Sequence, residues 1–220
     1  MTDKTDTFTE QDQDSLYRII QARRDMRHFV PDTHVPEDVL QRLLQAAHAA
    51  PSVGLMQPWR FIHIKNKTLR KSISQLVTTE RLLTSEALDS RKDEFLRLKV
   101  EGIRDCAELM VVVQAPDDGT VFGRRTLAKE MPLCSTACAI QNLWLAARAE
   151  NLGMGWVSFF DPNELGKLLH CPDDALPIAL LCIGPVKEFY EEPMLQQEHW
   201  RQARPLSEFI FTDHWQEKHD

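Results

Sequence analysis

Apolar residues recur at helical spacing in some stretches of this chain and form short continuous runs in others. Spacings of three and four residues predict amphipathic helices, and cap residues mark their ends. Pro36 suits the first position of one helix, Ser135 is expected to cap another, and Asp161 begins a third. The predicted helices are residues 11–24, 36–50, two within 68–104, 135–152 and one starting at 162.

The continuous runs predict strands. Leu109 to Gln114 is almost entirely apolar, which is typical of a strand buried on both faces of a sheet. Gly153-Met154-Gly155 follows a helix and lacks a third glycine, so we interpret it as a helix stop and a tight entry into a strand rather than a dinucleotide-binding fingerprint. The predicted strands are residues 61–64, 109–114, 156–160 and 178–183, with a polar loop over 116–132.

Composition narrows the class of function. The formal net charge of -7 argues against a nucleic-acid binder, which needs a basic face. No apolar run approaches the ~20 residues that cross a bilayer, and the polar first ten residues do not form a signal peptide. No internal repeat or flexible linker is visible, so we predict one domain over residues 11–220 behind a disordered tail of residues 1–10. A cytoplasmic protein with no membrane or nucleic-acid partner is expected.

The cysteines are five in number and scattered, which is typical of reduced thiols in the cytoplasm. Cys134 and Cys138 lie four residues apart and would share a helix face. A metal site needs two further ligands, and no second Cys/His pair stands at ligand spacing. We therefore expect no metal and interpret these two cysteines as small core residues.

One short segment, Arg23-Arg24-Asp25-Met26-Arg27, concentrates charge behind the first predicted helix. Three neighbouring guanidiniums must repel one another or share an anion, and phosphate oxygens match the guanidinium fork. Positive charge is expected to keep Asp25 ionised unless it is buried away from the arginines. A solvated basic turn at a helix end is the alternative.

Five motifs in this order resemble the nitroreductase-like flavoprotein superfamily over about residues 16–215, and within it most closely the 5,6-dimethylbenzimidazole synthases (BluB). The R-R-D form of the first motif, in place of the R-R-S common in nitroreductases, favours that subfamily. The motifs are R-R-D-M-R-H-F at 23–29, P-S-V-G-L-M-Q-P-W at 51–59, L-K-V-E-G-I at 98–103, Q-N-L-W-L-A-A-R-A-E at 141–150 and G-W-V-S at 155–158.

The resemblance implies an α+β fold with a central, mostly antiparallel sheet flanked by helices. It also implies an intertwined homodimer with a C-terminal arm and FMN at the dimer interface. The arginine cluster would hold the FMN phosphate, and the 51–59 and 155–158 motifs would contact the flavin or its ribityl chain. The FMN-binding residues implied in this way are Arg23, Arg24, Asp25, Met26, Arg27, Ser52, Gln57, Pro58, Leu98, Trp156, Val157, Ser158 and Arg201.

By the same resemblance, reduced FMN is a substrate that a flavin reductase supplies. Dioxygen drives fragmentation of its ring, and C1′ of the ribityl chain becomes C2 of 5,6-dimethylbenzimidazole. Asp25 matches the residue that takes a proton from C1′, and Ser158 matches one that donates or relays a proton. Their alternatives are a salt-bridge partner that spaces the arginines and a satisfied strand hydroxyl.

Two differences between this sequence and the family patterns keep other functions open. Leu55 stands where ordinary nitroreductases carry an asparagine that contacts the flavin, and the segment 123–134 fits the subfamily poorly. An NAD(P)H-dependent nitro- or quinone reductase that recycles FMN is one alternative. A non-enzymatic FMN carrier is the other.

Overall fold

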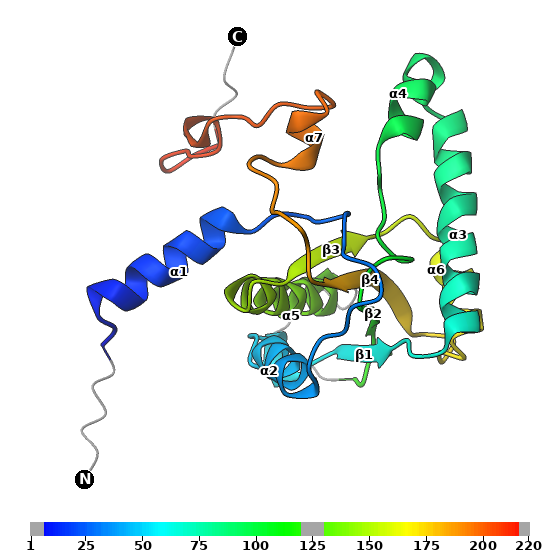
Figure 1. Ribbon diagram of the computed structural model, residues 1–220. Helices are drawn as coiled ribbons and strands as arrows, with labels where there is room; N and C mark the ends of the chain where they lie inside the picture. The colour runs from blue at the N-terminus through cyan, green and yellow to red at the C-terminus, as the bar shows by residue number, and fades with distance from the viewer. Residues whose placement is uncertain (1–6, 120–129, 216–220) are drawn as a thin grey trace.

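The computed structural model describes residues 7–119 and 130–215, and these ranges contain seven α-helices and four strands (Figure 1). The helices are α1 (Glu10–Ala22), α2 (Glu37–His48), α3 (Lys67–Glu86), α4 (Lys92–Arg97), α5 (Glu130–Ala149), α6 (Pro162–Leu168) and α7 (Met194–Gln197). The strands are β1 (Trp59–His63), β2 (Glu108–Gln114), β3 (Gly153–Val157) and β4 (Leu176–Gly184). Residues 120–129, which include most of the predicted polar loop and of the divergent 123–134 segment, lie outside the described ranges.

The strands form one antiparallel sheet in the order β1-β2-β4-β3. The central strands β2 and β4 carry the continuous apolar runs and are buried on both faces. Met110 and Val112 of β2 pack into the core with α2 and α5, whereas the alternate residues Leu109, Val111 and Val113 face α3 and α6. The predicted α+β class, with a mostly antiparallel sheet between helices, is confirmed.

Most predicted element ends are confirmed within two or three residues. The first helix ends at Ala22, and Pro36 caps α2 instead of being its first residue. Asp161 caps α6 as predicted, because its Oδ1 accepts hydrogen bonds from the backbone N–H groups of Asn163 at 2.8 Å and Glu164 at 3.0 Å.

Two predicted boundaries are wrong. Ser135 does not cap α5, which begins at Glu130; the Ser135 hydroxyl instead donates to the Met131 carbonyl inside the helix at 2.8 Å. The strand predicted over 156–160 spans Gly153–Val157, because the chain reverses at Asn151, whose φ is 56°. The glycines of the G-M-G segment therefore belong to β3.

The first helix and the last segment of the chain extend away from the sheet (Figure 1). None of the residues of α1 is buried, so its apolar face is left open to solvent in the single chain. The predicted C-terminal arm likewise exposes Phe209 and Ile210. No helix within the described ranges is both long and apolar enough to cross a membrane.

Candidate functional site

A cavity of about 420 Å³ lies where the arginine segment passes β3 and meets α3, α4 and α7. Its polar wall comes from the arginine segment, and its other walls are almost entirely apolar. Leu98, predicted as a site residue, is buried in this apolar wall. The lining residues are Arg23, Arg24, Asp25, Arg27, Thr84, Leu88, Phe95, Leu98, Val100, Phe159, Pro193, Met194, Leu195 and Trp200.

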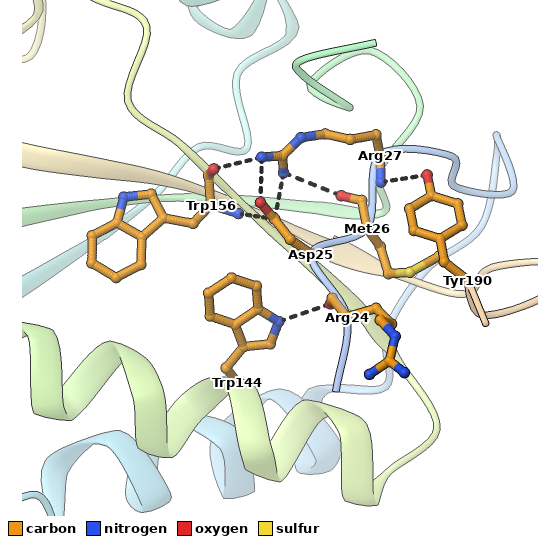
Figure 2. Close-up of polar contacts among 7 residues, drawn as sticks. All are labelled: Arg24, Asp25, Met26, Arg27, Trp144, Trp156 and Tyr190. Atoms are coloured by element: carbon orange, nitrogen blue, oxygen red, sulfur yellow. Dashed lines mark hydrogen bonds and ion pairs between the residues drawn. The ribbon is translucent and has the colours of Figure 1, made fainter. Parts of the chain in front are cut away.

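The carboxylate of Asp25 is fixed by three hydrogen bonds (Figure 2). Arg27 donates from Nη1 to Oδ1 at 2.7 Å and from Nη2 to Oδ2 at 2.6 Å, which is a bidentate pair. The backbone N–H of Trp156 donates to Oδ1 at 3.0 Å. An isolated parallel bridge between Asp25 and Met154 holds the backbone of this segment against β3. Asp25 is therefore presented at the cavity wall in one orientation.

The guanidinium of Arg27 points into the protein instead of toward an anion. It is buried and also donates to the carbonyls of Trp156 at 2.8 Å and Met26 at 3.3 Å. Both Nη atoms of Arg27 are thus engaged within the chain, and its contact with the FMN phosphate stays a prediction. Met26 was predicted to contact FMN, but its side chain is fully buried in the core.

Arg27 fits beneath β3 because Gly155 has no side chain. A Cβ at Gly155 would lie 2.2 Å from the Met26 carbonyl oxygen and 2.4 Å from Arg27 Nη1. From the sequence, this glycine was predicted to lie at a tight entry into a strand and in the G-W-V-S motif, and its close packing against Arg27 was not predicted. A glycine inside a strand is itself a signal of close backbone approach.

Burial raises the pKa of Asp25 above its usual value of 3.8, although Arg27 and the Trp156 N–H oppose this shift. The sequence predicted that positive charge keeps Asp25 ionised unless it is buried, and in the structure burial is the larger influence on this pKa. The Asp25 side chain is 43% exposed, while Arg27 and the Trp156 N–H bind its carboxylate oxygens.

The two remaining arginines differ in how many donors they leave free. Arg24 donates from Nη1 to the carbonyls of Gln21 at 2.6 Å and Arg23 at 2.8 Å, and from Nη2 to the Glu191 carbonyl at 2.7 Å. Its buried Nε has no partner. Arg23 makes no side-chain hydrogen bond to any described residue and lines the cavity. Arg23 is therefore the arginine of this segment whose donors are available to an anion, since no described residue accepts a hydrogen bond from them.

The G-W-V-S residues are split by the end of β3. Trp156 is half-buried and contributes its backbone to the Asp25 pair, while the Val157 side chain lies in the core. Ser158 follows the strand, is exposed and makes no side-chain hydrogen bond within the described ranges. It is therefore not the satisfied strand hydroxyl that was its alternative, and it does not line the cavity.

The tail closes the cavity with a tryptophan that sequence analysis did not assign. The Arg91 guanidinium lies 3.5 Å from the ring centroid of Trp200, and Arg91 Nη2 donates to the Trp200 carbonyl at 3.2 Å. The neighbouring Arg201, which was predicted to bind FMN, is exposed and does not line the cavity. The available signal was the aromatic residue beside Arg201, because an aromatic ring suits a flat ligand.

The predicted contacts of the 51–59 motif lie elsewhere. Ser52 Oγ accepts a hydrogen bond from the Gln57 backbone N–H at 3.1 Å, and the Val53 N–H donates to Ser135 Oγ at 3.2 Å. Gln57 lines a hollow beside α2 and β1, and Pro58 lines a small one near β2. A single chain therefore does not bring this loop to the cavity of the arginine segment.

Cys134 and Cys138 are both exposed on α5, so the interpretation that they are core residues is wrong. In residues 7–119 and 130–215, no three His, Cys, Asp or Glu side chains are grouped so that they could hold a metal ion.

Comparison with known proteins identifies the family of the chain. The model of the nitroreductase family matches residues 20–185. A 5,6-dimethylbenzimidazole synthase from Rhodospirillum rubrum is 39% identical over 198 residues, which are 87% of this chain and 92% of that protein. One from Rhodobacter capsulatus is 38% identical over 203 residues, which are 90% of this chain and 96% of that protein.

Among solved structures, nitroreductase A from Vibrio parahaemolyticus superimposes with a TM-score of 0.72 at 16% identity, covering 93% of this chain and 78% of that one. This structural likeness concerns the fold alone. The family match over most of the chain and the two relatives above one-third identity decide the classification: the chain belongs to the nitroreductase family.

Proposed function

We propose that this protein is a 5,6-dimethylbenzimidazole synthase, which consumes reduced FMN and dioxygen. One observation carries the proposal: the carboxylate of Asp25 stands in a fixed orientation at the wall of the cavity. A plain flavin reductase does not need a base at this place. Support comes from the two synthases that are 38% and 39% identical to this chain over nearly their whole length.

The residues around the cavity fit FMN. Arg23 lines the cavity, and no described residue accepts a hydrogen bond from its guanidinium, so its donors can serve the phosphate. The walls formed by Leu98, Phe159 and Trp200 suit a flat, apolar ring system. Charge and apolar surface are thus placed at different sides of one cavity, as an amphipathic ligand requires.

Reduced FMN supplies the electrons for the reaction with dioxygen and the carbon atoms of the product. Asp25 takes the proton from C1′ of the ribityl chain. Its raised pKa makes its carboxylate a stronger base than an exposed aspartate, which suits proton abstraction from carbon. Arg27 keeps the carboxylate oriented and opposes a still larger rise in this pKa.

Ser158 donates or relays a proton near the flavin. Its hydroxyl is exposed directly after β3 and is not engaged by any described residue, so it is free to bond to a ligand. In the single chain this hydroxyl lies outside the cavity lining, so its role depends on how the site is completed.

A second copy of the chain completes the site in this proposal. Ser52, Gln57 and Pro58 do not line the cavity of their own chain, and a homodimer would let the loop of one copy serve the arginine segment of the other. The exposed apolar faces of α1 and of the C-terminal arm give the two copies surfaces on which to pack. A cytoplasmic flavin reductase is the proposed source of reduced FMN.

The test is a single-turnover reaction. The purified protein is mixed with excess FMN, reduced chemically without NAD(P)H and exposed to air, and the products are separated by chromatography with mass detection. Appearance of 5,6-dimethylbenzimidazole with a matching loss of FMN is expected. Recovery of all the FMN in oxidised form would contradict the synthase and leave the reductase, which assays with nitroaromatics and NAD(P)H would then test.

A further inference from the structure

The face of α5 that meets the end of α1 holds the backbone of the arginine segment. Trp144 and Arg148 lie one helical turn apart on this face. Trp144 Nε1 donates to the Arg24 carbonyl at 3.2 Å (Figure 2), and Arg148 Nε donates to the Ala22 carbonyl at 3.2 Å. The two carbonyls flank Arg23 on both sides, so the backbone on each side of Arg23 is fixed by α5.

The side chain of Arg23 is held by the same tryptophan. Its guanidinium carbon lies 4.7 Å from the Trp144 ring centroid, a cation–π contact that uses none of the guanidinium N–H groups. Arg148 is itself braced, since it stacks 3.8 Å from the Phe189 ring centroid and donates to Asn151 Oδ1 at 3.1 Å. Arg23 therefore lines the cavity with an oriented guanidinium whose donors are not used by any described residue.

We propose that Trp144 and Arg148 are positioning residues that preorganise Arg23 for the phosphate of FMN; this inference rests on the proposed function. A long, flexible arginine loses rotamer freedom when it binds an anion. Holding it in the bound orientation beforehand reduces that cost and strengthens binding. The Q-N-L-W-L-A-A-R-A-E motif at 141–150, which supplies both residues, thereby acquires a role in ligand binding.

Riboflavin separates this role from a purely structural one, because it has the ring and the ribityl chain of FMN but no phosphate. A residue that only supports the fold affects both ligands alike. A residue that acts through Arg23 changes the affinity for FMN and leaves the affinity for riboflavin nearly unaltered. The ratio of the two dissociation constants is therefore the quantity to measure.

Titration of the full-length protein with oxidised FMN and with riboflavin, in wild type and in Trp144→Leu, makes the measurement. Wild type is expected to prefer FMN. Trp144→Leu should weaken FMN binding about tenfold, the size of one charge-assisted hydrogen bond, and riboflavin binding less than about twofold. Trp144→Phe keeps an aromatic ring without the N–H donor, so it should weaken FMN binding less than Trp144→Leu does.

Leu143→Ala is the matched control, because Leu143 is the fully buried neighbour of Trp144 on α5 and has no hydrogen bond to the arginine segment. It should lower thermal stability without changing the ratio. Should Trp144→Leu fail to fold, Trp144→Phe and Arg148→Met carry the test.

An unchanged ratio in all three variants, with a wild type that prefers FMN, would overturn the positioning role alone. A wild type that binds both ligands equally would overturn the phosphate site and this inference with it.

Discussion

The two segments that resemble FMN-binding motifs are organised in opposite ways. Hydrogen bonds hold the arginine segment to β3 through Asp25 and to α5 through Trp144, and the segment lines the cavity. The 52–58 loop is held by its own Ser52–Gln57 contact and by Ser135, and at its tip Leu55 is 78% exposed. One segment is complete within a single chain, whereas the other presents its polar groups away from that cavity.

The difference indicates which contacts of the proposed site one chain forms by itself and which ones require a second chain. The proposed base Asp25 and the proposed anion donor Arg23 require a rigid frame to orient them, and the sheet and α5 supply it within one chain. Contacts that complete a site across an interface have no such frame until the partner arrives. A loop exposed in the single chain is therefore what a shared site predicts, and the following experiments probe each side of the comparison.

The largest effect is expected from Asp25→Asn. The amide keeps the shape of the side chain and an acceptor for the Trp156 N–H, but it cannot take a proton. Formation of 5,6-dimethylbenzimidazole should fall by a factor of about 100 or more, as for loss of a general base, while the FMN dissociation constant stays within about threefold. Wild-type product yield from this variant would remove Asp25 from the chemistry.

Gly155→Ala should disturb the packing of the arginine segment against β3 without removing a reactive group. The added methyl would meet the Met26 carbonyl and Arg27 Nη1, and backbone cannot move aside cheaply. We expect a loss of about 1–3 kcal/mol in the free energy of unfolding, measured in denaturant. Gly166→Ala is the control, since its Cβ would meet nothing closer than 3.8 Å. Equal stability of both variants would contradict the close packing of Arg27 under β3.

Ser158→Ala tests a hydroxyl that belongs neither to the arginine segment nor to the 52–58 loop. The hydroxyl has no partner in the described chain, so its loss should change the free energy of unfolding by less than about 0.5 kcal/mol. Product formation should slow about tenfold while oxidation of reduced FMN continues. An unchanged product yield would remove the proton-donating role of Ser158.

The smallest effect is a pH dependence of stability. Folding raises the pKa of Asp25 above 3.8, so the folded protein holds this proton more tightly than the unfolded chain. The stability that Asp25 contributes is therefore fully present below 3.8 and is lost as pH rises through the folded pKa. Thermal melts of wild type and Asp25→Asn should be compared from about pH 4 to about pH 8. As the pH rises, the stability of the variant should increase relative to that of wild type. If the variant instead became more stable relative to wild type as the pH falls, the pKa of Asp25 would be lowered by folding.

Periodicity and cap residues predicted the sheet, its two central strands and most helix ends, because burial on alternate faces leaves a mark in the sequence. Ser135 was misassigned because a helix accepts Pro132 in its first turn, and the hydroxyl can bond inside the helix as readily as at its start. Nothing in the local sequence shows whether Ser135 caps the helix or lies inside it.

At the site, the structure brings Arg23, Asp25 and Leu98 to one cavity, and their predicted contacts with FMN stay predictions. The sequence could not show that Arg27 turns inward, since that depends on the space that Gly155 leaves across the strand. Nor could the sequence show that Arg201 lies outside the cavity lining, because the chain presents Trp200 to the cavity in its place. Directions of side chains at the ends of elements are set by tertiary contacts.

The shared site is tested most directly by mixing two defective chains. Arg23→Ala removes the free phosphate donor, and a second variant carries Ser52→Ala with Gln57→Ala. Differently tagged copies are expressed together, and the mixed dimer is purified and titrated with FMN. Each parent dimer should bind FMN weakly, whereas the mixed dimer should bind about one FMN with wild-type affinity, because one of its two sites receives both intact segments. A mixed dimer as weak as its parents would place both segments in the same chain's site and contradict the shared arrangement.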